Sequence, residues 1–257
     1  MTKRTIIALI GTAIIALVAG MQIARLYPSS QSRDFLPTSA PTDHELPMTV
    51  ASLSETTKLY SIRGEYPQFN STAKSLSTMI ATDVNARIAE FKKNATENWK
   101  ARQDTTPTGQ PKEANPTTPF DFIVTWEPKQ LNTRTISLIV RIYAYEGGAH
   151  GNSELKTYNY NVQTGSPLSL ASLFPDDPNY LAMLSKYAYD RLLQYLTTAS
   201  DGHVQMDMLK QGTAPTPDNF KNFTFNDNAI TFYFPKYQVA PGVFGEQTVM
   251  FGRATTQ

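Results

Sequence analysis

The sequence predicts an α+β fold built from antiparallel sheets with packed helices. Two observations support this prediction. Apolar residues alternate with polar ones in several short runs, as in strands that bury one face. In two longer runs they recur every three or four residues, as in amphipathic helices. The order of these runs allows two parts in the region after residue 57, which we place at residues 58–119 and 120–257.

The first part begins with an extended segment and continues as a long helix. Ser71 or Thr72 can cap this helix. Its apolar stripe consists of Leu76, Ile80, Val84, Ile88, Phe91, Ala95 and Trp99. Because the stripe has helical spacing, we expect Phe91 and Trp99 to pack in the core rather than to form a site. A proline-rich loop follows at residues 104–119.

The second part combines strands with two helices. The expected strands cover residues 120–126, 136–144, 155–162, 223–225, 230–234 and 248–251. A helix with an apolar stripe is expected over residues 181–195, after the cap at Asp176-Asp177-Pro178. A short helix is expected from His203 to Gln211.

An uncharged run from Thr5 to Ala24 predicts a membrane anchor over residues 1–25. About 20 residues at 1.5 Å each span about 30 Å, the thickness of a bilayer core. Lys3 and Arg4 favour an orientation in which the rest of the chain is exported. A cleaved signal peptide with a site near residues 18–20 is the alternative. Both interpretations place the following region outside the cytoplasm.

Residues 26–57 are rich in proline, serine and threonine and show no sustained period. We therefore expect an extended, mobile tether there. His44 lies in this stretch between Asp43 and Glu45, which is typical of a solvated linker rather than of a metal ligand.

The composition excludes several classes of protein. The 23 lysines and arginines nearly balance 22 acidic residues, with no long basic run, which argues against nucleic-acid binding. The absence of cysteine excludes disulfides, thiolate zinc sites and a cysteine nucleophile. With three histidines in 257 residues, little material remains for a histidine-rich metal site. We expect no metal and no other cofactor.

The most unusual stretch is residues 143–152, where three glycines surround His150 between two expected strands. In a functional interpretation His150 is a general base with Glu146 nearby, or a metal ligand. In a structural interpretation His150 hydrogen-bonds across a tight turn that Gly147 and Gly148 permit. The sequence offers no zinc-ligand spacing and no G-x-S-x-G nucleophile elbow, so the structural interpretation is favoured.

A second candidate lies near the end of the chain. Tyr237, Val243 and Phe244 occur in a loop-like run and are candidates for a surface that contacts a partner, because aromatic side chains anchor interfaces. Phe232 and Phe234 alternate with polar neighbours and are expected in the core.

Three motifs in this order resemble a known family of envelope domains. They are residues 146–152, residues 158–174, and residues 232–241 with Gly245. The same order is found in the extracytoplasmic domain of the lysozyme-sensing anti-sigma factor RsiV and in the N-terminal domain of the peptidoglycan deacetylase PdaC. The resemblance runs from about Lys58 to Phe251. It implies an α+β domain that binds lysozyme or wall glycan, with Gly147, Gly148, His150 and Tyr237 as motif positions.

The sequence therefore predicts a membrane-anchored extracytoplasmic binding module of the bacterial envelope that recognises peptidoglycan or a muramidase such as lysozyme. Its candidate binding residues are Gly147, Gly148, His150, Tyr237 and Phe244. One alternative is a cell-wall hydrolase that uses His150 as acid or base. Another is a regulator that reaches a membrane partner through its N-terminal helix.

Overall fold

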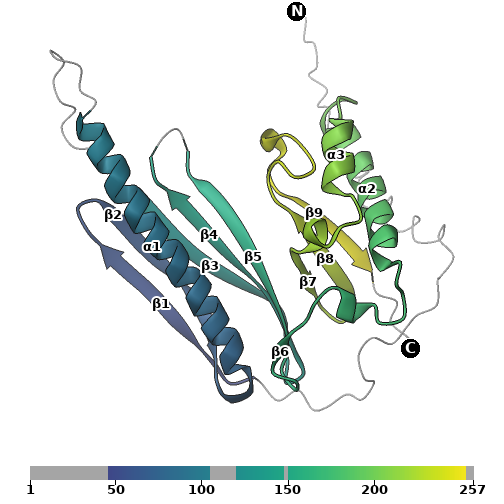
Figure 1. Ribbon diagram of the computed structural model, residues 1–257, viewed down its shortest axis with the longest axis horizontal. Helices are drawn as coiled ribbons and strands as arrows, with labels where there is room; N and C mark the ends of the chain where they lie inside the picture. The colour runs from purple at the N-terminus through teal and green to yellow at the C-terminus, as the bar shows by residue number, and fades with distance from the viewer. Residues whose placement is uncertain (1–45, 105–119, 148–149, 253–257) are drawn as a thin grey trace, which may run out of the picture.

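The structure, a computed structural model, describes residues 46–104, 120–147 and 150–252 and has an α+β fold (Figure 1). The described strands form a six-stranded and a three-stranded sheet. The predicted anchor, most of the predicted tether and nearly all of the proline-rich loop lie outside these residues. No described helix is long and apolar enough to span a membrane.

The six-stranded sheet runs in chain order. Its strands are β1 (Met48–Thr56), β2 (Tyr60–Phe69), β3 (Phe120–Leu131), β4 (Thr135–Tyr145), β5 (Asn152–Asn161) and β6 (Ser166–Pro167). Neighbours are antiparallel except β2 and β3, which are parallel. The expectation of antiparallel pairing alone was thus wrong at one place. The long helix α1 (Lys74–Asp104) links these two strands, as a parallel pair requires.

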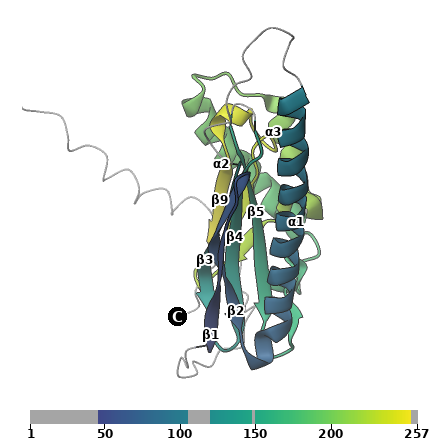
Figure 2. The ribbon, with the colours of Figure 1, turned by 90° about the vertical axis from the view of Figure 1, so that its left-hand side faces the viewer.

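Helix α1 covers one face of this sheet (Figure 2). A single 3-10 turn, η2 (Ser71–Ala73), leads into it, where the sequence predicted a helix start. The predicted apolar stripe is confirmed as the core-facing side of the helix. Phe91 is fully buried, with its ring centroid 5.8 Å from Tyr60 and 5.1 Å from Phe122. Trp99 packs against the same core.

The three-stranded sheet carries the second core. Its strands are β7 (Phe223–Phe225), β8 (Ala229–Phe234) and β9 (Gln247–Gly252), and the helices α2 (Tyr180–Ala199) and α3 (Met206–Gly212) accompany them. Short 3-10 turns lie at η3 (Ala171–Leu173), η4 (Pro217–Phe220) and η5 (Gly242–Phe244). Phe232 and Phe234 are buried here and contact the ring of Phe220 edge-on, which confirms their predicted core position.

Two predicted boundaries were wrong. The segment Met48–Thr56 was assigned to the tether but forms β1, an edge strand paired with β2 along its whole length. The border at residue 120 also fails, because β3, β4 and β5 complete the sheet that β1 and β2 begin. The first core ends at Val162 and the second starts at Leu170, so the two parts divide between these residues.

A buried polar network joins the two parts. Ser137 of β4 donates to Asn159 Oδ1 of β5 at 2.6 Å, and Asn159 Nδ2 donates to the carbonyl of Phe223 at 2.8 Å. The amide of Phe225 donates to Ser137 Oγ at 2.9 Å. Because strand side chains alternate and Ile136 packs in the α1 core, Ser137 points to the opposite face. Strand β7 is therefore fixed against the face that α1 leaves free.

Candidate binding site

The turn between β4 and β5 contains the glycine-histidine motif. Gly147 has φ 106°, a conformation that L side chains rarely adopt, which explains a glycine there. Gly148 lies outside the described residues. His150 is exposed, and its Nδ1 lies 3.1 Å from the carbonyl oxygen of the next residue, Gly151. This contact is local. The structural interpretation predicted a hydrogen bond from His150 across the turn, and the contact to Gly151 does not cross it.

Glu146 faces α1. Its Oε2 accepts a hydrogen bond from Asn94 Nδ2 at 3.2 Å, and its backbone carbonyl accepts one from Asn98 Nδ2 at 2.7 Å. Its Oε1 is buried and has no hydrogen-bond partner among the described residues. Glu146 therefore ties the turn to α1, and the structure gives no contact between it and His150.

Tyr143 of β4 lies against Gly151 next to this turn and was not among the residues predicted for the site. A Cβ atom on Gly151 would overlap the Tyr143 ring and lie 2.5 Å from its hydroxyl oxygen. Gly151 therefore leaves room for the Tyr143 ring where it now lies against the backbone. In the sequence, only Gly151 itself indicated that a side chain such as Tyr143 packs closely on the backbone here.

Tyr237 lies in the loop between β8 and β9, and its side chain is 63% exposed. Its φ of 72° is left-handed, which is rare for a bulky residue. Lys236 Nζ lies 5.2 Å from the ring centroid. A Cβ on Gly242 would overlap the same ring, so the tyrosine ring packs directly over Gly242. The predicted surface position of Tyr237 is confirmed.

Gln238 fixes this loop to α3 and η4 of the second part. Its Nε2 donates to the carbonyl of Gly212 at 2.9 Å and to that of Asn219 at 3.0 Å. The backbone of Gln238 also packs so closely on Gly212 that a Cβ there would overlap the Gln238 carbonyl oxygen. The loop is thus a supported structure, and Tyr237 is held in place by its neighbour.

The two predicted partner residues further along this loop differ in exposure. Val243 is 88% exposed, whereas Phe244 packs partly against the second core. Phe244 is therefore a support for the loop as much as a surface residue. Within this loop the exposed large hydrophobic side chains are those of Tyr237 and Val243.

An ion pair between Arg141 and Glu246 also connects the two parts. Arg141 of β4 donates through Nη1 and Nη2 to the two carboxylate oxygens of Glu246, each at 2.9 Å. The hydrogen bonds that Arg141 donates to the Glu246 carboxylate raise the pKa of the Arg141 guanidinium. Sequence reasoning missed this pair because its members are 105 residues apart.

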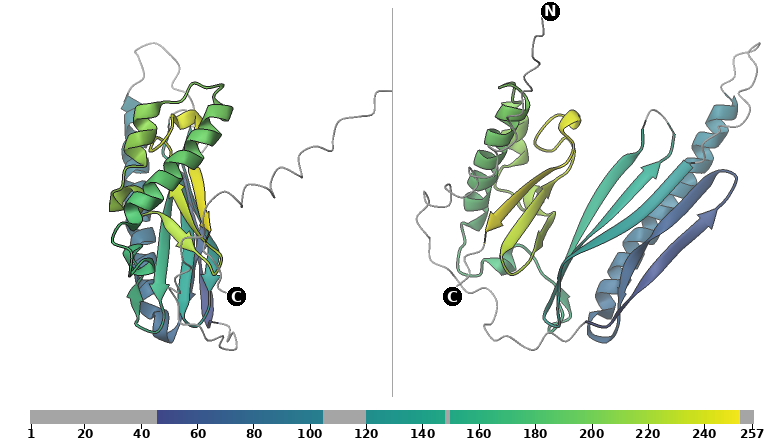
Figure 3. Two further views of the ribbon diagram at one scale, coloured as in Figure 1. Left: turned by 90° about the vertical axis from the view of Figure 1, so that its right-hand side faces the viewer. Right: turned by 180° about the vertical axis from the view of Figure 1, so that it is seen from behind.

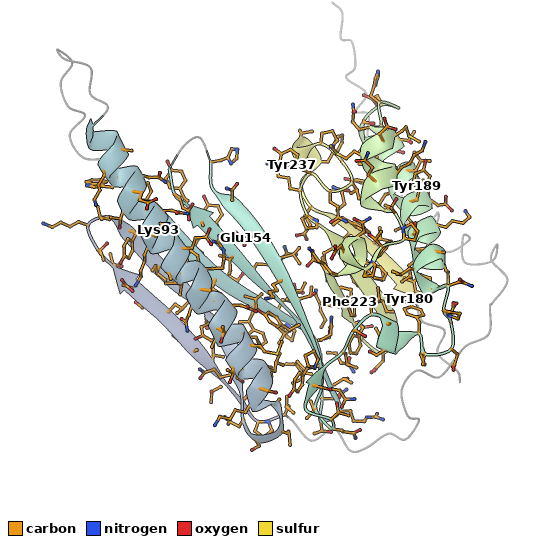
Figure 4. All side chains as sticks on the ribbon, viewed as in Figure 1. Lys93, Glu154, Tyr180, Tyr189, Phe223 and Tyr237 are labelled. Carbon is orange, nitrogen blue, oxygen red and sulfur yellow. The ribbon has the colours of Figure 1, made fainter. Side chains whose placement is uncertain are left out.

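The two motif segments lie at the same end of the molecule. In Figures 1 and 3, the end of β4 and the start of β5 lie at the same end of the molecule as the loop that follows β8. In Figure 4, Tyr237 lies on the side of its part that faces β5, the strand of Glu154. The fold thus brings the region of Gly147 and His150 and the region of Tyr237 to one end. Among the described residues no group of three or more histidine, aspartate or glutamate side chains could hold a metal.

Comparison with family models divides the chain as the two cores do. The model of the family described as deacetylase PdaC matches residues 53–153. The model of DUF3298, a protein family of unknown function, matches residues 171–253.

Two curated proteins are similar in sequence. Peptidoglycan-N-acetylmuramic acid deacetylase PdaC of Bacillus subtilis is 30% identical over 200 residues, which cover 78% of this chain and 39% of that protein. Esterase Rv3036c of Mycobacterium tuberculosis is 23% identical over 111 residues, which cover 43% of this chain and 46% of that protein. The chain thus spans less than half the length of each.

Two solved structures share the fold. A DUF3298-family member from Bacteroides fragilis superimposes with a TM-score of 0.55 at 15% identity, covering 82% of this chain and 92% of that chain. A DUF3298-family protein from Pseudomonas aeruginosa gives a TM-score of 0.50 at 14% identity, covering 80% and 90%. At this identity the likeness shows the fold.

Proposed function

We propose, on the premise that this chain carries a PdaC-like domain, that it is an extracytoplasmic module of the bacterial envelope that binds peptidoglycan. The B. subtilis relative is named for its action on a sugar of peptidoglycan, and the match covers 39% of that protein. The region that the two proteins share can therefore be a module that recognises the wall polymer. The uncharged run at Thr5–Ala24 would anchor the module in the cell membrane.

One observation carries this proposal: Tyr237 combines backbone strain with exposure. A non-glycine residue in the left-handed region costs about 1–3 kcal/mol, and such strain clusters at binding sites. Tyr237 gains little burial in return, because its side chain is 63% exposed. An exposed tyrosine ring with a hydroxyl group offers both an apolar face and a hydrogen-bonding group, which suits a sugar ring.

Replacing Tyr237 with glycine should separate folding from binding. The variant Tyr237→Gly removes the ring and relieves the left-handed strain, so we expect an unfolding free energy that is unchanged or higher by up to about 1 kcal/mol. We expect its affinity for insoluble peptidoglycan, measured by co-sedimentation of the full chain, to fall about tenfold or more.

Tyr195 provides the matched control, because it is a tyrosine on α2 with a side chain that is 54% exposed. We expect Tyr195→Ala to bind peptidoglycan as the wild type does. Equal binding by wild type and Tyr237→Gly would contradict the assigned site.

A muramidase is the second ligand that the resemblance to the lysozyme sensor suggests. Immobilised C-type lysozyme tests it with the same variants. Repeating both assays at high salt separates a contact made by charges, which salt weakens, from one made by aromatic side chains.

A hydrolase remains the alternative function, and the names of both curated relatives favour it, because a deacetylase and an esterase both cleave acyl groups. His150 is the candidate acid or base in this account. It is exposed to solvent, and among the described residues its ring makes one hydrogen-bond contact, to Gly151, so a substrate could reach it.

The alternative predicts that His150→Ala lowers acetate release from acetylated peptidoglycan by about 100-fold or more. The unfolding free energy should stay within about 0.5 kcal/mol of wild type, because the side chain is exposed. His203→Ala is the matched control, since His203 is exposed and makes the same kind of contact, from Nδ1 to Ser200 O at 3.1 Å. A wild type that releases no acetate, or equal loss in both variants, contradicts the hydrolase.

A further inference from the structure

The outer strands β5, β7 and β9 each make contacts with other elements of the fold. At β5, the amide of Leu168 beside β6 donates to Asn159 O at 2.8 Å, and the Glu154 carboxylate accepts a hydrogen bond from Arg87 Nε of α1 at 3.1 Å. At β9, the Tyr187 hydroxyl donates to Met250 O at 3.0 Å. Side chains of the large sheet bond the backbone of β7, as described above. Contacts and charges at a strand edge hinder its pairing with another chain.

The outer edge of β1 lacks this coverage within residues 46–104, 120–147 and 150–252. Figure 2 views the molecule from this side, and no other described element lies over the strand. The strand has nine residues, MTVASLSET, without proline, lysine or arginine. Its one charged residue, Glu55, is held by Lys92 Nζ at 2.7 Å and by the Tyr60 hydroxyl at 2.8 Å. Long, uncharged edges of this kind are templates for strand pairing.

We propose that β1 pairs with β1 of a second copy of this chain, antiparallel and centred on Ser52. This register pairs all nine residues, whereas any other centre leaves residues unpaired at the ends. It places Val50 opposite Ser54, which lie on the same face, and Ala51 opposite Leu53, which lie on the α1 face, so the pleat continues across the interface. Glu55 faces Thr49, so no like charges meet.

The position where the chain leaves the described residues favours a second copy as the occupant. The described part starts at Leu46, two residues before β1. In the paired strands the two Met48 ends lie eight residues apart along the strand, about 27 Å at about 3.4 Å per residue. The roughly 20 residues between the proposed anchor and Leu46 reach about 65 Å when extended, so two anchors fit in one membrane. This step alone rests on the anchor in the proposed function.

A cysteine at the symmetry centre tests the register directly, because the chain has no cysteine of its own. In the full chain Ser52→Cys should form a disulfide-linked dimer under mild oxidation, since directly opposed Cα atoms lie about 4.5–5.5 Å apart. Ser54→Cys is the matched control. Its two copies would be offset by four residues, about 14 Å, which is beyond disulfide reach.

We expect Ser52→Cys to crosslink about tenfold faster than Ser54→Cys or more, a difference that random collision would not produce. Equal rates for the two variants, or no crosslinking of Ser52→Cys, would overturn the proposal. Because neither assay contains a ligand, failure of peptidoglycan binding leaves this result unaffected.

A charged residue at position 52 gives a second, independent test, in which light scattering measures the mass of the particle. Two lysines at position 52 would face each other, so Ser52→Lys should shift the full chain from dimer to monomer in light scattering. Ser153→Lys, at an exposed position of β5, should remain dimeric like the wild type. A monomeric wild type at all concentrations contradicts the proposal.

Discussion

Replacing Gly64 with alanine is expected to destabilise the protein by about 3–5 kcal/mol, the sum of backbone strain and overpacking. Gly64 has φ 124°, and a Cβ there would overlap the carbonyl oxygen of Val124 and lie 2.7 Å from its amide nitrogen. Both atoms belong to the backbone of β3, which is the parallel neighbour of β2. Neither can yield without breaking the pairing in the centre of the sheet.

Chemical denaturation of the full chain measures this loss, with far-UV circular dichroism as the readout. Gly252→Ala is the matched control, because a Cβ at that position of β9 meets nothing within 4 Å. We expect the control to stay within about 0.5 kcal/mol of wild type. A loss below about 1 kcal/mol for Gly64→Ala would contradict the close approach of β2 to β3.

Replacing Gly212 with alanine should affect both stability and the candidate binding site. The added Cβ would overlap the carbonyl oxygen of Gln238 and lie 2.8 Å from Val239 Cγ1. Relief requires the loop to move away from α3, which lengthens the hydrogen bond from Gln238 to the Gly212 carbonyl. We expect a loss of about 2–3 kcal/mol in unfolding free energy and about tenfold weaker binding to peptidoglycan, because Tyr237 moves with its neighbour.

The variant Gly202→Ala is the control that separates the loss of stability from the loss of peptidoglycan binding. Gly202 has φ 86° and open space around its missing side chain, so Gly202→Ala costs about 1 kcal/mol of strain without moving the loop. We expect it to bind peptidoglycan like the wild type. If Gly212→Ala binds normally in co-sedimentation at a temperature where it is folded, the loop does not position the site.

Much of the fold could be predicted because periodicity reports which face of an element is buried. The stripe from Leu76 to Trp99 repeats at helical spacing over several turns, so α1 was predicted with its core side. Strand β4 was predicted from alternation, since alternate residues from Ile136 to Ala144 face the α1 core.

Strand β1 could not be predicted in the same way. Its core-facing positions are Ala51, Leu53 and Glu55, which give one strongly apolar residue in a stretch of serine and threonine. Edge strands bury less than central ones, so their alternation is weak. The parallel pairing of β2 with β3 is non-local and depends on α1 crossing the sheet, which local periodicity does not report.

The candidate site was predicted in pieces rather than as a whole. The glycines around His150 indicated a close backbone approach, which the structure shows at Gly151 beside Tyr143, whereas the packing of Tyr237 on Gly242 was not predicted. Sequence reasoning did not predict that Glu146 turns toward Asn94 on α1, because that contact depends on how the helix packs.

Binding of the wild-type full chain to insoluble peptidoglycan tests the central claim most directly. Co-sedimentation at low and high salt, with a cellulose pellet as the control polymer, distinguishes specific binding from trapping. We predict saturable binding to peptidoglycan that persists at high salt, because an aromatic side chain rather than a charge supplies the contact. A chain that stays in the supernatant at every peptidoglycan concentration, whether or not it binds lysozyme, would contradict the account.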